Sequence, residues 1–265
     1  MRFSLDPRRP REMMMFMSVL DNSLTSARYG ELAGARIMIT GLSPAHGVDI
    51  ARAFADHKAR LVLQTAAATD PETTAMIAVL AETAHEIKLF DDPINTVAAA
   101  QRFAQTGTQT YGSVDAVINI IPVLPSEMAD LKSLEDVEAF VAAKLSAALQ
   151  ITKIAANRMR LMMTEGLILN IVAMPEAAGG ASAAVAGILR AALAAMTRTE
   201  AEAWAGNGIR INAMGPRAVL PGKKADAALA SEPEMAAVAL YLASKRARGL
   251  SGHIFDAEGS LTSCG

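Results

Sequence analysis

The 265-residue sequence has one cysteine, few aromatic residues and no excess of positive charge. Cys264 has no partner for a disulfide within the chain, and no Cys/His cluster offers metal-ligand spacing, so we expect no metal site and a cytoplasmic location. Lys and Arg number 25 against 27 Asp and Glu, which excludes the basic surface typical of nucleic-acid partners. No continuous apolar run reaches the ~18 residues of a membrane helix, and we expect no membrane partner.

Hydrophobic residues are plentiful, at 52% of the chain against 20% charged residues, so a large core can form. Residues 1–31 read as an N-terminal extension in which Arg8, Arg9 and Arg11 precede the apolar run Met13–Met17. A secretory signal is the alternative, but Glu12 interrupts the basic flank and no clear cleavage site follows. We expect the Met-rich face to pack on the body or on a neighbouring subunit.

From Leu32 onward, short apolar runs alternate with Ala-rich stretches of helical periodicity. Strands are expected at 36–40, 61–63, 86–90, 116–120, 167–172, 209–213 and 253–255. Helices are expected from Val48, from Pro71, and over 94–106, 133–163, 183–204 and 234–244. Such alternation builds a doubly wound parallel sheet covered by helices on both faces. The prediction is one α/β, Rossmann-type domain of about seven strands over 32–265.

The first strand is followed by the turn Thr40-Gly41-Leu42-Ser43-Pro44-Ala45-His46-Gly47. Glycines in such a turn let a pyrophosphate approach backbone N–H groups at a helix start. A degenerate glycine turn also joins strand to helix in proteins that bind no nucleotide. The turn resembles the Thr-Gly-x-x-x-Gly-x-Gly motif of the short-chain dehydrogenase/reductase family, with Ala45 at the middle glycine.

Further motifs extend this resemblance over about residues 32–260. Asp91 follows the third strand, as does the aspartate of the family that meets the adenine, and Asn119 matches the first residue of its Asn-Asn-Ala-Gly signature. Both also have plain interpretations as strand-end and turn-stabilising side chains. The resemblance implies a dinucleotide, NAD or NADP, bound through Gly41, Ser43, His46, Gly47, Asp91 and Asn119. Gln64-Thr65-Ala66 after the second strand carries neither an acid nor an arginine, so it indicates no preference between the two cofactors.

The residues that perform the reaction in this family are a serine, a tyrosine and a lysine. Gly166–Ala173 and Arg190–Arg198 resemble the flanking segments, which places Ala173 at the serine, Ala186 at the tyrosine and Arg190 at the lysine. Arg190 stays protonated and does not replace the base. Arg217 and Pro221 likewise replace the glycine and threonine of the segment that touches the nicotinamide. The resemblance therefore implies a scaffold without the usual chemistry.

Tyr241 and Lys245 have the catalytic Tyr-x-x-x-Lys spacing, but the surrounding residues match the C-terminal segment of the family, away from the nicotinamide. Three hypotheses remain open. The chain is a non-catalytic, nucleotide- or partner-binding subunit of a homo- or hetero-oligomer built on the helices at 133–163 and 183–204. Alternatively, it is an oxidoreductase with a non-standard acid or base such as Lys144, Glu176 or Arg190. In the third hypothesis, nucleotide binding is lost and only an interaction surface remains.

Overall fold

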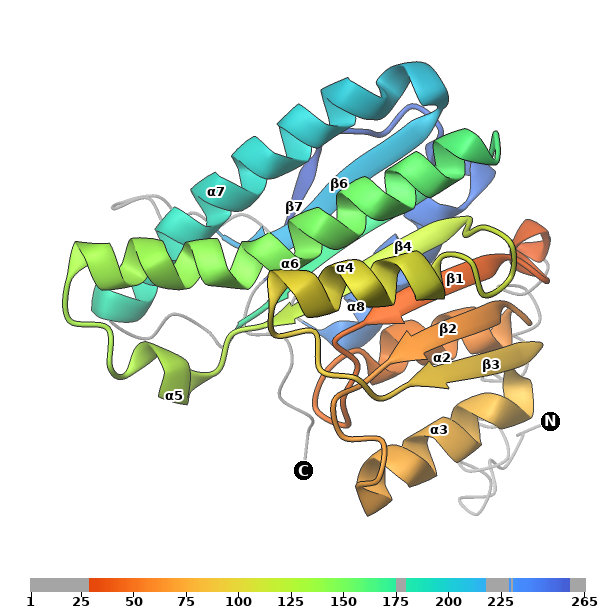
Figure 1. The fold of residues 1–265 in the computed structure, drawn as a ribbon, viewed down its shortest axis with the longest axis horizontal. Coiled ribbons are helices and arrows are strands. Elements are labelled where there is room, and N and C mark those ends of the chain that lie inside the picture. Colours follow the sequence, from red (N-terminus) through yellow and green to blue (C-terminus); the bar gives the residue numbers. More distant parts are fainter. Residues whose placement is uncertain (1–28, 175–179, 218–228, 230, 258–265) are drawn as a thin grey trace, which may run out of the picture.

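The computed structural model describes residues 29–174, 180–217, 229 and 231–257. Most of the expected N-terminal extension, Glu176, Pro221 and Cys264 lie outside these residues. The described part forms a seven-stranded parallel sheet of order β3-β2-β1-β4-β5-β6-β7 (Figure 1). Its strands are β1 (Arg36–Thr40), β2 (Arg60–Gln64), β3 (Glu86–Phe90), β4 (Ala116–Pro122), β5 (Gly166–Ala173), β6 (Ile209–Pro216) and β7 (Ile254–Ala257). The predicted fold class is confirmed.

The central strands are buried along most of their length because helices cover both faces of the sheet. All eight residues of β5 are buried, which is the pattern of a parallel strand enclosed on two sides. Strand order reverses between β1 and β4, since the chain runs outward through β2 and β3 before it returns. A switch point of this kind leaves a crevice beyond the carboxyl ends of the strands.

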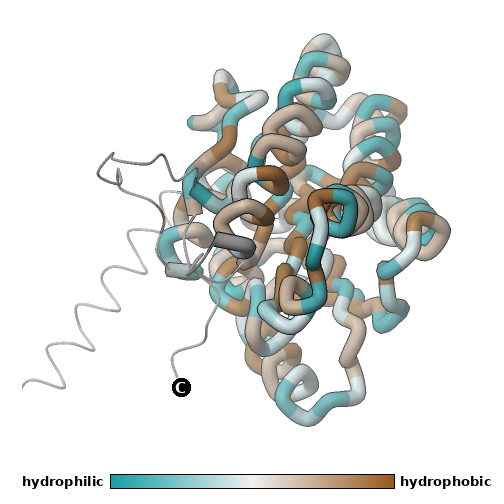
Figure 2. Tube along the Cα trace, turned by 90° about the vertical axis from the view of Figure 1, so that its left-hand side faces the viewer, coloured by the Kyte–Doolittle hydropathy of each residue, from teal (hydrophilic) through white to brown (hydrophobic). Residues whose placement is uncertain are grey.

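Two helical layers enclose the sheet. On one face, α2 (Val48–Asp56), α3 (Pro71–Thr83) and α8 (Glu232–Ala243) share a core cluster that includes Ile37 and Ile39 of β1. On the other face, α4 (Val97–Gly107), α6 (Leu134–Leu161) and α7 (Gly180–Trp204) pack over Met38 and its neighbours. Hydrophilic positions gather in the outer turns and loops of the trace, and hydrophobic ones toward its middle (Figure 2).

Local capping explains where the helices begin. Asp70 accepts a hydrogen bond from the Thr73 N–H at 3.0 Å, so α3 begins at Pro71 as predicted. Thr96 caps α4 in the same way at 3.2 Å, which starts that helix at Val97 rather than at the expected Ile94. Three short helical segments escaped the sequence patterns: η1 (Gly30–Leu32), α5 (Pro125–Met128) and η3 (Lys245–Ala247); a fourth, η2 (Ala205–Asn207), follows α7.

Helix α6 is long and apolar enough, by length and composition alone, to cross a membrane. The expectation from continuous apolar runs missed it, because Lys144 and Lys153 interrupt a helix otherwise rich in Ala and Leu. In the structure α6 packs between α4 and α7 and against β4 and β5. Its buried face includes Ile151, Ala155 and Met159, and a core helix of this kind meets the same criterion.

Candidate functional site

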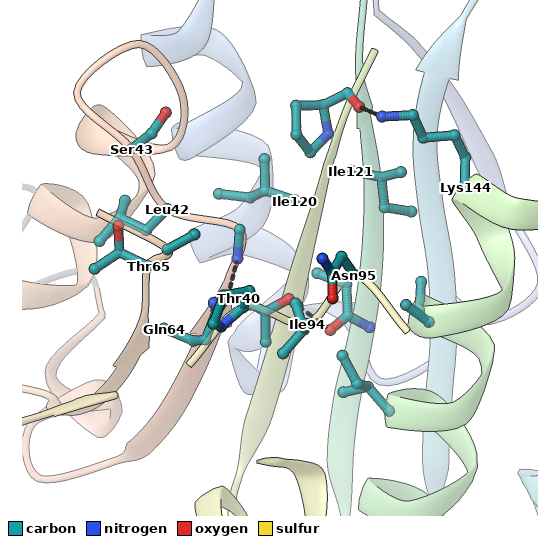
Figure 3. Close-up of a pocket in the computed structure, with 18 of the residues that line it drawn as sticks. Thr40, Leu42, Ser43, Gln64, Thr65, Ile94, Asn95, Ile120, Ile121 and Lys144 are labelled. Atoms are coloured by element: carbon teal, nitrogen blue, oxygen red, sulfur yellow. Dashed lines mark hydrogen bonds between the residues drawn. The ribbon is translucent and has the colours of Figure 1, made fainter. Parts of the chain in front are cut away.

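A cavity of about 540 Å³ opens at the carboxyl ends of β1, β2 and β4, between the turn after β1 and helix α6 (Figure 3). Its size is within the range of small-molecule sites. Apolar side chains form most of the wall, and polar groups are few. The apolar members include Leu42, Ile94, Ile120, Ile121, Phe140 and Ile151; the polar members include Ser43, Gln64, Thr65, Asn95, Asn119, Glu127 and Lys144.

The two glycines of the turn are required by Ile120 of β4. Gly41 and Gly47 have φ of +71° and +87°, which side-chain-bearing residues rarely adopt. A Cβ on Gly41 would overlap the carbonyl oxygen of Ile120, and a Cβ on Gly47 would overlap its Cδ1 atom. The space that the glycines leave is therefore filled by Ile120.

Backbone N–H groups of the turn donate within the chain. The Gly41 N–H donates to Gln64 Oε1 at 2.9 Å, and the Leu42 N–H donates to the Gln64 carbonyl at 3.1 Å. Ser43 and His46 exchange two backbone hydrogen bonds of 3.0 Å, and Ser43 Oγ lies 3.1 Å from His46 Nδ1. Burial lowers the pKa of His46. These groups are not free to bind a phosphate.

Gln64 occupies the end of β2, where the resemblance leads one to look for a ribose-binding or phosphate-binding residue. Its Oε1 accepts from Gly41, and its Nε2 donates to the Asp92 carbonyl at 2.9 Å. The side chain therefore ties the turn after β1 to the loop after β3. Since donor and acceptor both have partners, Gln64 acts as a structural bridge.

Asn119 is buried in a row of polar side chains across three strands. Thr40 Oγ1 donates to Asn119 Oδ1 at 3.1 Å, and Asn119 Nδ2 donates to Asn170 Oδ1 at 2.8 Å. Asn119 also lines the cavity, as do Gly41 and Ser43. His46, Gly47 and Asp91 are not among the lining residues, and Asp91 is exposed.

A residue that sequence reasoning missed reaches the start of α2. Glu232, in the first turn of α8, accepts from the Asp49 N–H at 2.7 Å and lies 3.5 Å from the Ile50 N–H. The backbone of Gly47 also helps to lower the pKa of this carboxylate. Burial raises the pKa of Glu232, while the backbone N–H groups lower it. The contact spans 183 positions of sequence, so only the fold reveals it.

The positions matched to the catalytic serine and tyrosine are apolar and buried. Ala173 ends β5, and Ala186 on α7 packs in a cluster with Ile121, Val172 and Met174. Both alanines are at most 3% exposed. A methyl group neither donates nor accepts a proton, so these two positions contribute packing and neither an acid nor a base.

Arg190, at the position matched to the lysine, is held by the last two strands. Its Nη1 lies 2.6 Å from Asp256 Oδ1 of β7 and donates to the Pro216 carbonyl at 2.9 Å. The guanidinium is not among the residues that line the cavity. This geometry gives Arg190 a structural partner on the sheet.

Lys144 lines the cavity and is paired. Its Nζ lies 2.7 Å from Glu127 Oε2 of α5 and donates to the Pro122 carbonyl at 2.8 Å.

Tyr241 and Lys245 lie near the end of α8 that is opposite to Glu232. This helix has 12 residues and is therefore roughly 18 Å long. Lys245 lines a separate cavity beside the amino ends of the strands. The sequence-based rejection of Tyr241 and Lys245 agrees with this placement.

Within the described ranges, no three His, Cys, Asp or Glu side chains lie close enough together to hold a metal ion.

Comparison with protein families places this geometry in context. A family model described as "Enoyl-(Acyl carrier protein) reductase" matches residues 45–232, more than half of the chain. Glucose 1-dehydrogenase 2 of Bacillus subtilis is 22% identical over 256 residues, covering 88% of this chain and 97% of that protein. D-threitol dehydrogenase of Mycolicibacterium smegmatis is 25% identical over 247 residues, covering 87% and 94%.

Solved structures share the same architecture. An NADH-dependent reductase complexed with NAD superimposes with a TM-score of 0.67 at 22% identity, covering 87% of this chain and 98% of that one. A hydroxysteroid dehydrogenase from Escherichia coli gives a TM-score of 0.68 at 19% identity, covering 86% and 97%. At these identities the likeness concerns the fold alone.

Proposed function

Because the chain belongs to the short-chain dehydrogenase/reductase family, a family of oxidoreductases, we propose that it is a divergent member that does not perform ordinary ketoreduction and acts as a ligand-binding or partner-binding subunit. The burial of Ala173 and Ala186 is the observation that carries this proposal. In the family pattern these positions hold the substrate oxygen and exchange its proton.

The absence of the serine and tyrosine hydroxyl groups should lower the reaction rate strongly. Proton transfer by a positioned side chain is worth about 10²–10⁴-fold in rate. Arg190 is engaged by Asp256 and Pro216, and guanidinium keeps its proton. We therefore expect reduction of simple ketones to be negligible even when cofactor and substrate are supplied.

The family implies NAD or NADP, and the residues present do not fit its pyrophosphate. Ile120 fills the space over Gly41 and Gly47, and the N–H groups at the start of α2 already bind Glu232. The cavity beside the turn has a volume of about 540 Å³ and a mostly apolar wall, which is enough for a small ligand. The binding function is therefore assigned to that cavity.

Activity measurements and a reconstruction test the loss of chemistry. The wild-type chain is assayed with NAD(P)H on a panel of ketones, alongside a variant carrying Ala173→Ser, Ala186→Tyr and Arg190→Lys. Turnover by the wild-type chain would contradict the proposal. Activity in the triple variant alone would confirm the alignment of the three positions and would contradict the poor fit to pyrophosphate; an inactive triple variant is the result expected if the cofactor does not bind.

A second candidate is an oxidoreductase with a relocated acid. Lys144 favours it, because its ammonium group is at the cavity wall with Glu127 beside it. Turnover that Lys144→Met abolishes, while Lys153→Met on the same helix leaves it intact, would establish this alternative.

An oligomer forms part of the main proposal. Helices α6 and α7 pack side by side on one face of the sheet, and we expect a second subunit to bind there. Analytical ultracentrifugation tests it, since sedimentation as a monomer at micromolar concentration would exclude a stable homo-oligomer.

A further inference from the structure

The start of helix α2 is an anion-binding position that already holds an anion. A helix N-terminus favours negative charge because its first N–H groups lack intrahelical acceptors and its dipole is positive there. Glu232 supplies the charge, with Oε1 at 2.7 Å from the Asp49 N–H. The same carboxylate belongs to the first turn of α8. Two helix N-termini therefore converge on one side chain.

Among its described lining residues, the cavity next to this position offers no free positive charge to a phosphate. Lys144 is the cation on its wall, and Glu127 neutralises it at 2.7 Å. Leu42, Ile94 and Ile120 provide apolar surface, with the Asn95 amide nearby (Figure 3). Such a wall suits a planar heterocycle with hydrogen-bonding edges.

We propose that Glu232 is an internal substitute for a ligand phosphate, so that the cavity takes an uncharged, nucleoside-sized heterocycle and excludes phosphate-bearing ligands. The uncharged-ligand half rests on the binding function proposed above. The exclusion of phosphate rests on the Glu232 contacts alone. A ligand phosphate placed about 4 Å from the Glu232 carboxylate would be strongly repelled by it. Because Glu232 is partly exposed, solvent screens this repulsion, and we expect it to weaken the binding of a phosphate roughly a hundredfold.

Isothermal titration calorimetry with three probes separates these halves. Adenosine tests the cavity, inorganic pyrophosphate tests the start of α2, and ADP tests both together. Glu232→Ala removes the carboxylate and frees the N–H groups. Glu232→Gln keeps an acceptor oxygen without the charge, and Glu234→Ala is the matched control for losing an exposed acid in the same helix turn.

The wild-type chain and Glu234→Ala should bind adenosine. Both should bind pyrophosphate and ADP at least a hundredfold more weakly than they bind adenosine. Glu232→Ala should gain pyrophosphate and ADP binding by about that factor, and Glu232→Gln by less, because its oxygen still occupies the N–H groups. Circular dichroism verifies that each variant is folded; if Glu232→Ala unfolds, Glu232→Gln must still gain affinity for ADP.

Two results would overturn the proposal: wild-type binding of pyrophosphate as tight as that of the variants, or no gain of affinity in any Glu232 variant. Failure of adenosine to bind any form, together with gained pyrophosphate binding, would refute the uncharged ligand and the proposed ligand-binding function. Phosphate exclusion by Glu232 would then stand by itself.

Discussion

Adding one methyl group at Gly47 should destabilise the protein by much more than its backbone angle alone predicts. A positive φ costs a side-chain-bearing residue about 1–2 kcal/mol, and Gly47 has φ of +87°. Its new Cβ would also overlap Ile120 Cδ1, and overpacking of a core typically adds about 1–3 kcal/mol. The expected loss for Gly47→Ala is therefore roughly 2–5 kcal/mol.

Gly112 provides a matched control for the backbone term. It has φ of +81°, and a Cβ there would meet no atom within 4 Å. Gly112→Ala should therefore lose only about 1–2 kcal/mol. The difference between the two substitutions measures the overlap with Ile120.

Removing the overlapping atom should recover part of the loss. Ile120→Val deletes Cδ1 and costs about 0.5–1.5 kcal/mol by itself. In the double variant, Gly47→Ala should cost about 1–3 kcal/mol less than it does alone, a coupling expected of residues in contact. Urea denaturation followed by circular dichroism gives the free energies of unfolding of the wild-type chain, the three single variants and the double variant. Equal losses for Gly47→Ala and Gly112→Ala, or no coupling with Ile120→Val, would refute the close approach of Ile120 to the turn.

Three further predictions concern the turn and the helix starts. The pKa of His46 should lie below its ordinary value of 6.5, because burial disfavours the imidazolium; proton-detected NMR titration measures it. Since this pKa is depressed, the stability that His46 contributes is present above pH 6.5 and is lost as the pH falls through the folded-state pKa, and a measured value of 6.5 or higher contradicts the burial. Gln64→Ala should destabilise by about 1–3 kcal/mol, because the Gly41 N–H loses its side-chain acceptor; an unchanged denaturation midpoint would argue against the bridge. Ser133→Ala should cost about 1 kcal/mol through loss of the cap that accepts from the Asp136 N–H, and an unchanged melting temperature would show that the cap is dispensable.

The sequence predicted the sheet well because most of its strands are short runs dominated by hydrophobic residues. The strand predicted at 167–172 and the helix predicted from Pro71 agree with the structure. Both depend on signals between residues close together in the sequence: a hydrophobic run for the buried strand and a capping residue for the helix. Boundaries shifted where a cap competed with periodicity, as at Thr96. Local patterns were sufficient for the scaffold.

The site was less predictable because its contacts join distant segments. Gly41 and Gly47 were identified as a turn, but their neighbour Ile120 comes from β4 and their anion from α8. Lys144 was named as a candidate acid, while its partner Glu127 is on the short helix α5, which no periodicity indicated. A sequence pattern marks which side chains are present and does not state which of them already have partners.

The polar row through Thr40, Asn119 and Asn170 has a consequence for how the strands align. These residues face one another in register across β1, β4 and β5. The residues that flank the two asparagines are Ile and Leu, so a shifted pairing of β4 with β5 would bury nearly the same apolar surface. It would also place each amide opposite an aliphatic side chain, at about 1–3 kcal/mol for every polar group left without a partner. The row thus specifies the pairing register of β1, β4 and β5 at the centre of the sheet. The same register sets the position of Ile120 on β4 relative to the turn after β1.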